Sequence, residues 1–196
     1  MREHNPTIYF ATGNKGKLVE ANHIAQVFGI RLKQMKIEKT EIQSDELEDI
    51  ASFAAKRASE TARRSVVAED AGLFVNELRG FPGPYSAYVF KTIGINGVLN
   101  LLKGAKDRNA SFRAVLSFAR PGSHPVCFDG EVKGMITRKP RGSLGFGFDP
   151  IFVPMQADGR TFAEMDTREK NLLSHRAKAF VKFFTWVTMK QRSIFS

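Results

Sequence analysis

The chain has 196 residues, of which 42% are hydrophobic, enough to bury one substantial core in a single domain over residues 1–196 with two lobes. A formal net charge of +10, from 30 Lys and Arg against 20 Asp and Glu, suits a polyanionic partner such as nucleic acid, an acidic membrane surface or a phosphorylated small molecule. A solvated basic surface without a partner fits this charge equally well. The single cysteine, Cys127, excludes an internal disulfide and a thiol-rich metal site.

No apolar run reaches membrane-spanning length, and the run at residues 8–11 is too short for the core of a signal peptide, so we expect a soluble cytoplasmic protein. The first half of the chain alternates buried strands with amphipathic helices. They are predicted at 7–11 (strand), 18–28 (helix), 30–37 (strand), 45–62 (helix) and 65–68 (strand). Gly29 is the predicted end of the first helix, and Asp45 the predicted cap of the second. The third strand runs straight into Glu69 and Asp70.

The second half begins with a rigid Gly- and Pro-rich loop and changes to a hairpin pattern. Its predicted elements are a loop at 80–84, a helix over much of 85–102, strands at 112–118 and 126–133, a long loop at 137–150 and a helix from about 169. Helices that alternate with strands around a central hairpin indicate a mixed α/β fold. We expect an elongated mixed sheet flanked by helices, with a central active-site cleft between two lobes.

A phosphate site is predicted at Thr12-Gly-Asn-Lys-Gly-Lys17, between a strand and a helix. Free N–H groups at a helix start, a flexible glycine backbone and lysine side chains together hold phosphate well. The spacing matches neither the Walker A pattern nor the dinucleotide fingerprint. By itself the segment also fits an ordinary turn with solvated lysines.

A carboxylate site is predicted at Glu69 and Asp70, where a buried strand is expected to end. Adjacent strand residues point to opposite sides, so at most one of the two should face a ligand unless the chain bends there. Oxygen ligands suit Mg²⁺, which commonly takes one or two carboxylates together with phosphates and water. Glu41, before the second helix, could reach the same end of the sheet. A pair of exposed turn carboxylates is the alternative.

Two further segments carry candidate ligands for a base and for phosphate. In Gly145-Phe-Gly-Phe-Asp-Pro150, Phe146 could stack on a base and Asp149 could accept hydrogen bonds from ring N–H groups. In Lys170-Asn-Leu-Leu-Ser-His-Arg176, a single helix would place Lys170 and Ser174 on one face with His175 at its edge. Core phenylalanines and a solvated basic face are the alternatives.

The order of these motifs resembles the inosine triphosphate pyrophosphatase family, whose members remove non-standard purine nucleoside triphosphates. The resemblance also includes Glu41-Ile-Gln43, Ala68-Glu-Asp-Ala-Gly-Leu73 and Gly80-Phe-Pro-Gly-Pro-Tyr-Ser-Ala87, and it extends from Ile8 to about Phe184. It implies hydrolysis of inosine, deoxyinosine and xanthosine triphosphates to the monophosphate and pyrophosphate. It also implies a homodimer, and neither a stable nucleic-acid complex nor membrane binding is expected.

By the same resemblance, Glu41 and Asp70 hold Mg²⁺, and Asp70 also orients or deprotonates the attacking water. The implied substrate-binding residues are Thr12, Asn14, Lys17, Lys56, Ala71, Phe146, Gly147, Phe148, Asp149, Lys170, His175 and Arg176. The family often has Ser where this chain has Ala71, so a contact through that hydroxyl is lost. A donor on Arg176 or His175 aimed at a 6-oxo group would oppose the 6-amino group of adenine. This predicts preference over ATP, and it leaves the rejection of GTP unexplained.

Three other readings compete with this one. A nucleic-acid-binding module would explain the charge and the aromatic residues, but it does not predict Glu41 and Asp70 in register with a lysine loop. A pyrophosphatase for pyrimidine or modified nucleotides would use the same stacking residue, Phe146. A catalytically silent regulatory protein would bind triphosphate without cleaving it.

Overall fold

The fold is a single mixed sheet with helices on both faces, seen in a computed structural model that describes residues 7–36 and 42–194. Within these residues seven strands pair in the order β2-β1-β3-β5-β6-β7, and β4 pairs with β3. The strands are β1 (Thr7–Ala11), β2 (Arg31–Met35), β3 (Val66–Val75), β4 (Pro82–Gly83), β5 (Asn109–Ala119), β6 (Val126–Ile136) and β7 (Phe152–Pro154). β1 is parallel to β2 and β3, and the other pairs are antiparallel. The predicted mixed α/β class is confirmed.

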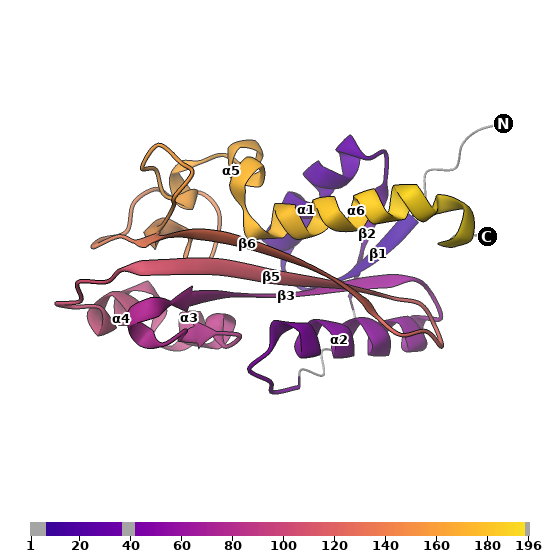
Figure 1. Ribbon diagram of the computed structural model, residues 1–196, viewed down its shortest axis with the longest axis horizontal. Coiled ribbons are helices and arrows are strands. Elements are labelled where there is room, and N and C mark those ends of the chain that lie inside the picture. Colours follow the sequence, from indigo (N-terminus) through magenta and orange to yellow (C-terminus); the bar gives the residue numbers. More distant parts are fainter. Residues whose placement is uncertain (1–6, 37–41, 195–196) are drawn as a thin grey trace.

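Two groups of helices cover the two faces of the sheet (Figure 1). The α-helices are α1 (Lys15–Val27), α2 (Leu47–Ala62), α3 (Ser86–Thr92), α4 (Gly94–Leu101), α5 (Thr167–Leu173) and α6 (His175–Ile194), and short 3-10 turns are η1 (Asn76–Leu78), η2 (Asp149–Ile151) and η3 (Phe162–Glu164). α1, α5 and α6 lie on one face, and α2, α3 and α4 lie on the other. β5 and β6, of 11 residues each, give the molecule its long axis.

Buried apolar residues form two main clusters along this axis. One joins β1, α1 and α6, where the Phe10 and Phe180 rings meet edge to face at 5.4 Å. The other joins β3 and β5 to the turns near β7, where the Phe112 and Phe152 rings lie 4.7 Å apart. The expectation that most phenylalanines are core residues therefore holds for these positions. One domain with two lobes stays a prediction, and the two clusters support it.

Several predicted element boundaries are wrong, three of them at positions that shape the site. β3 does not end at Ala68 but continues to Val75, because β5 pairs with it from Val66 to Val75, so Glu69 and Asp70 lie within a strand. The helix predicted over much of 85–102 is two helices, separated where Gly94 adopts a φ of +62°. The final helix breaks at Ser174, whose ψ is 151°. Lys170 and His175 consequently belong to different helices.

The second helix also starts differently from the prediction. It begins at Leu47, with Glu46 at the cap position and no side-chain cap hydrogen bond. Ser44, rather than Asp45, organises the entry, because its Oγ accepts from the Glu46 N–H at 3.1 Å and donates to Asp49 at 2.9 Å. A serine hydroxyl can both donate and accept, which a carboxylate cannot.

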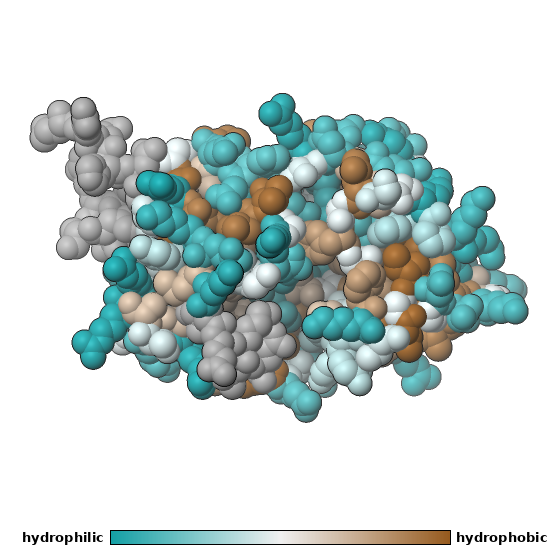
Figure 2. Space-filling model, turned by 180° about the vertical axis from the view of Figure 1, so that it is seen from behind, coloured by the Kyte–Doolittle hydropathy of each residue, from teal (hydrophilic) through white to brown (hydrophobic). Residues whose placement is uncertain are grey.

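The face seen in Figure 2 is largely hydrophilic, and its apolar residues lie in scattered groups. Exposed large apolar side chains do occur on several elements, Tyr88 on α3 and Leu172 on α5 among them. No described helix combines the length and apolar character needed to cross a bilayer.

Candidate active site

The site is built around an open stretch of one edge of β3. On that edge β1 pairs with β3 over Val66–Ala68, and β4 pairs with it at Leu73 and Phe74. Between these segments, residues 69–72 have no strand partner on this edge within the described part of the chain. Both faces of the strand can therefore be reached from one cavity. The sequence-based expectation that at most one of two adjacent carboxylates faces a ligand did not include such an open edge.

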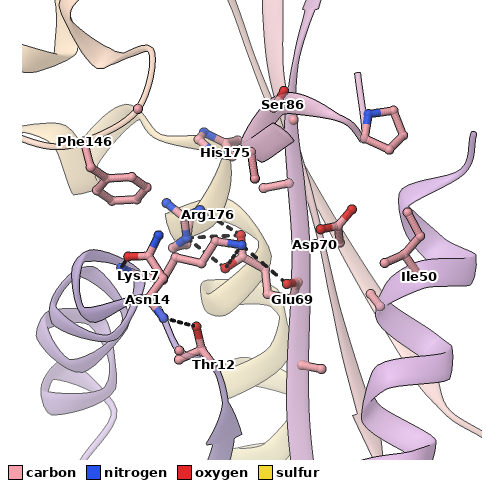
Figure 3. Close-up of a pocket in the computed structure, with 18 of the residues that line it drawn as sticks. Thr12, Asn14, Lys17, Ile50, Glu69, Asp70, Ser86, Phe146, His175 and Arg176 are labelled. Carbon is pink, nitrogen blue, oxygen red and sulfur yellow. Dashed lines mark hydrogen bonds and ion pairs between the residues drawn. The ribbon is translucent and has the colours of Figure 1, made fainter. Parts of the chain in front are cut away.

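Glu69 and Asp70 use this open edge in opposite ways (Figure 3). The Glu69 side chain points to the side of α1 and α6, toward Lys17 and Arg176. The Asp70 side chain points to the other side, toward Ile50 of α2. The alternation is that of an ordinary strand, as predicted, but both residues line the same cavity. The alternative of two exposed turn carboxylates is wrong.

The cavity has a volume of about 390 Å³, within the range of small-molecule sites. It brings together most of the predicted site residues: Thr12, Asn14, Lys17, Asp70, Ala71, Phe146, Gly147, Phe148, Asp149, Lys170, His175 and Arg176. Lys56 is exposed on α2 and is not among the lining residues, whereas its neighbour Arg57 is. Glu41 lies outside the described residues.

The loop from Thr12 to Lys17 is held in shape by its own side chains. The hydroxyl of Thr12 accepts a hydrogen bond from the Asn14 N–H at 3.1 Å. Asn14 caps α1, and its Oδ1 accepts from the Lys17 N–H at 3.2 Å. Gln34 of β2 donates to the Thr12 carbonyl at 2.8 Å. A preformed turn at a helix start, beside a lysine, is an arrangement that favours phosphate.

A buried network of ion pairs lies on the Glu69 side of β3. Arg176 donates from Nε and Nη2 to the Glu69 carboxylate, at 2.9 to 3.1 Å, and from Nη1 to Glu20 at 2.6 Å. Lys170 bridges Glu20, at 2.7 Å, and Asp149. Arg176 is only 2% exposed, so these charges depend on one another. Four separate elements, α1, β3, α5 and α6, are thereby fixed relative to the loop that carries Asp149.

Burial and ion pairing pull the pKa values of the network in different directions. Burial would raise the pKa of Glu69, but Arg176 and Lys17 outweigh it and hold that pKa below its usual value. The pKa of Glu20 is also lowered, because the charges of Arg176 and Lys170 outweigh the effect of burial. Burial raises the pKa of Asp149 in spite of Lys170. Burial, followed by the charges of Arg176 and Lys170, lowers the pKa of His175 well below its usual range, so its imidazole is neutral near pH 7.

Glu20 is the network member that sequence reasoning missed. It lies on the buried face of α1, 4% exposed, and joins Lys170 to Arg176. Its position three residues after Lys17 puts it on the same helix face as that lysine, which is the signal that could have identified it.

The aromatic end of the cavity is formed by the loop before η2. Phe146 packs so closely on Gly16 that a β-carbon there would come within 2.5 Å of the ring. Lys170 Nζ and Arg176 Cζ lie 4.8 and 5.4 Å from the centre of the Phe146 ring. Asp149 is 3% exposed, and its Oδ2 accepts the Phe146 N–H at 2.8 Å. An aromatic ring and hydrogen-bonding groups therefore meet at one end, as a flat heterocycle requires.

The donor set of the cavity fits Mg²⁺ better than a softer metal. No group of three His, Cys, Asp or Glu side chains that could hold a metal occurs among the described residues. A closed structural site is therefore absent from them, whereas Mg²⁺ needs only one or two carboxylates because phosphates and water complete its shell. Asp70 supplies such a carboxylate to the cavity.

Comparison with known proteins gives a consistent result over almost the whole chain. The model of the Ham1 family matches residues 8–186. A dITP/XTP pyrophosphatase of Methanopyrus kandleri is 48% identical over 179 residues, which cover 91% of this chain and 95% of that protein. One of Saccharolobus solfataricus is 51% identical over 172 residues, 88% of either chain. The solved structure of a HAM1 protein from Coxiella burnetii superposes with a TM-score of 0.80 at 31% identity, covering 93% of this chain and 98% of that one.

Proposed function

The chain belongs to the Ham1 family, and we propose that its cavity binds and hydrolyses non-standard purine nucleoside triphosphates such as dITP and XTP. The enzyme is a nucleoside triphosphate pyrophosphatase, which releases the monophosphate and pyrophosphate. The observation that carries the assignment of the site is the open edge of β3, which puts Asp70, the Thr12–Lys17 loop and Phe146 on one cavity. A nucleic-acid-binding module would not need these three features on one cavity, because it binds its strand along an open groove.

The phosphates are proposed to bind at the start of α1. Thr12 and Asn14 keep the loop in shape, and Lys17 supplies a positive charge beside β3. Ala71 and the glycine Gly147 line the cavity without polar side chains, so they contribute backbone and space. Charge on the phosphates is thus met by groups that are already oriented, which is the condition for electrostatic catalysis.

Hydrolysis is a displacement at the α-phosphorus with pyrophosphate as the leaving group. Asp70 is proposed to accept a proton from the attacking water or to hold that water in line. Asp70 would also hold Mg²⁺, with Glu41 as the second ligand predicted from the sequence. When bound, the ion neutralises phosphate charge and lowers the pKa of water.

The base is proposed to lie against Phe146, with Asp149, Lys170 and His175 at its edge and Phe148 in the adjoining wall. The Arg176 donors already bonded to Glu69 and Glu20 fix the plane of its guanidinium, which leaves its remaining N–H groups for a 6-oxo oxygen. Adenine offers an amino donor at that position, so a buried donor would stay unpaired. The preference for 6-oxo purines over ATP follows from this.

The test is pyrophosphate release from a panel of dITP, XTP, ITP, GTP, ATP and a pyrimidine triphosphate, with Mg²⁺, with Ca²⁺ and with a chelator. We expect release from dITP and XTP that needs Mg²⁺ and exceeds release from ATP by at least about tenfold. Equal rates with ATP and XTP would contradict the base assignment, and rates unaffected by the chelator would contradict the metal. A homodimer and a cytoplasmic location stay predictions, and sedimentation of the pure protein checks the first.

A further inference from the structure

The cavity holds two cations that none of the motifs accounts for. Arg57 extends from α2 and Lys91 from α3, both on the Asp70 side of β3, and both line the cavity. Both side chains are exposed, and neither forms a hydrogen bond or an ion pair with any of the described residues. They differ in this from Lys17, Lys170 and Arg176, the cations that line the cavity on the opposite side of the strand.

The cations of the Glu69 side are already neutralised before substrate arrives. The network pairs as many carboxylates as cations: Lys17, Lys170 and Arg176 with Glu20, Glu69 and Asp149. Such a group orients its members strongly but offers little net charge to an approaching anion. A nucleoside triphosphate carries several negative charges, and Asp70 adds another to the cavity. Besides the proposed Mg²⁺, cations outside the network can therefore add to the attraction for the triphosphate.

We propose that Arg57 and Lys91 are substrate-binding residues that hold the triphosphate from the wall facing the Thr12–Lys17 loop. An Arg guanidinium can bind two phosphate oxygens at once, and a Lys ammonium acts as a mobile point charge. Their exposure keeps both solvated until substrate binds, so no carboxylate has to be displaced. The inference rests on the proposed function, and it adds Arg57 of α2 to the residues that hold the phosphates.

The test measures binding of inorganic triphosphate, which has no base, to the full chain by calorimetry, together with kcat and KM for XTP. Arg57→Gln and Lys91→Gln should each weaken binding of inorganic triphosphate and raise KM by about tenfold, while kcat changes less. Arg57→Lys should recover part of the lost affinity, because lysine restores the positive charge but cannot bind two phosphate oxygens at once as a guanidinium does. The double variant should also lose most of the salt dependence of KM.

A matched control is Arg63→Gln, which removes the same charge from a residue just beyond the end of α2 and outside the cavity lining. It should leave both affinity and KM unchanged. Unchanged affinity in both Arg57→Gln and Lys91→Gln would overturn the inference. So would a loss in Lys56→Gln that Arg57→Gln does not share. An enzyme that cleaves XTP normally in all variants refutes only this inference, whereas a wild type that releases no pyrophosphate refutes the proposed function itself.

Discussion

Charged side chains are buried and paired on one side of β3, and cations are exposed on the other. On the side of α1 and α6, Glu69 and its partners are buried and mutually paired. On the side of α2 and α3, Asp70 meets a wall with two exposed cations, Arg57 and Lys91. The first arrangement fixes geometry, and the second is proposed to bind and hydrolyse an anionic substrate. One strand with an open edge can therefore serve both purposes through two adjacent residues.

The largest effect is expected at Asp70. Asp70→Asn removes the carboxylate needed for water and metal but keeps the shape of the side chain. We expect kcat for XTP to fall by about 10² to 10⁴ while the free energy of unfolding changes little. Steady-state kinetics and chemical denaturation measure the two quantities. A variant that keeps full activity would show that the catalytic carboxylate lies elsewhere.

The neighbouring substitution should do the reverse. Glu69→Gln removes one of the two carboxylate charges that neutralise the buried Arg176. The free energy of unfolding should therefore fall by about 3 to 5 kcal/mol. Glu131→Gln is the control, because its ion pair with Arg113 is exposed and should contribute less than about 1 kcal/mol. Equal, small losses in both variants would remove the distinction between the two sides of β3.

The aromatic end should have a smaller effect, confined to binding. Phe146→Leu removes the ring face, and base stacking contributes about 1 to 3 kcal/mol, so KM for XTP should rise by roughly tenfold to a hundredfold. Phe146→Tyr keeps the ring and should stay close to the wild type. Binding of inorganic triphosphate should be the same in all three proteins. If it fell together with KM in Phe146→Leu, the ring would act on the phosphate loop through Gly16 instead.

The smallest effect concerns pH. The buried His175 stays neutral in the folded chain, whereas the unfolded chain binds a proton below its usual pKa of about 6.5. The unfolded state therefore gains protons as the pH falls, and stability decreases. Between pH 6.5 and 5.5 the loss from this residue should be about 1 kcal/mol. His175→Gln should flatten this segment of the stability curve. The lowered pKa values of Glu20 and Glu69 act only below about pH 4.5, so the two ranges separate.

Local patterns predicted much of the fold, and most of the predicted site residues line the cavity. The strand predicted over Thr7–Ala11 is confirmed. It could be predicted because a short apolar run bounded by turn residues is typical of a buried strand. The extension of β3 to Val75 could not be seen, since it depends on pairing with β5, about 40 residues later. The break at Ser174 was not predicted either, because Leu172, Leu173, Arg176 and Ala177 around it favour helix. Arg57 and Lys91 belong to none of the sequence motifs, and only the packing of α2 and α3 brings both residues to the same cavity.

The most direct test of the account is the position of the bond that water breaks. Hydrolysis of XTP in ¹⁸O-enriched water, followed by mass spectrometry of both products, locates the incoming oxygen. Attack at the α-phosphorus predicts label in the nucleoside monophosphate and unlabelled pyrophosphate. Label in pyrophosphate would contradict attack at the α-phosphorus, and orthophosphate as the first product would contradict the assignment of this cavity as a pyrophosphatase site.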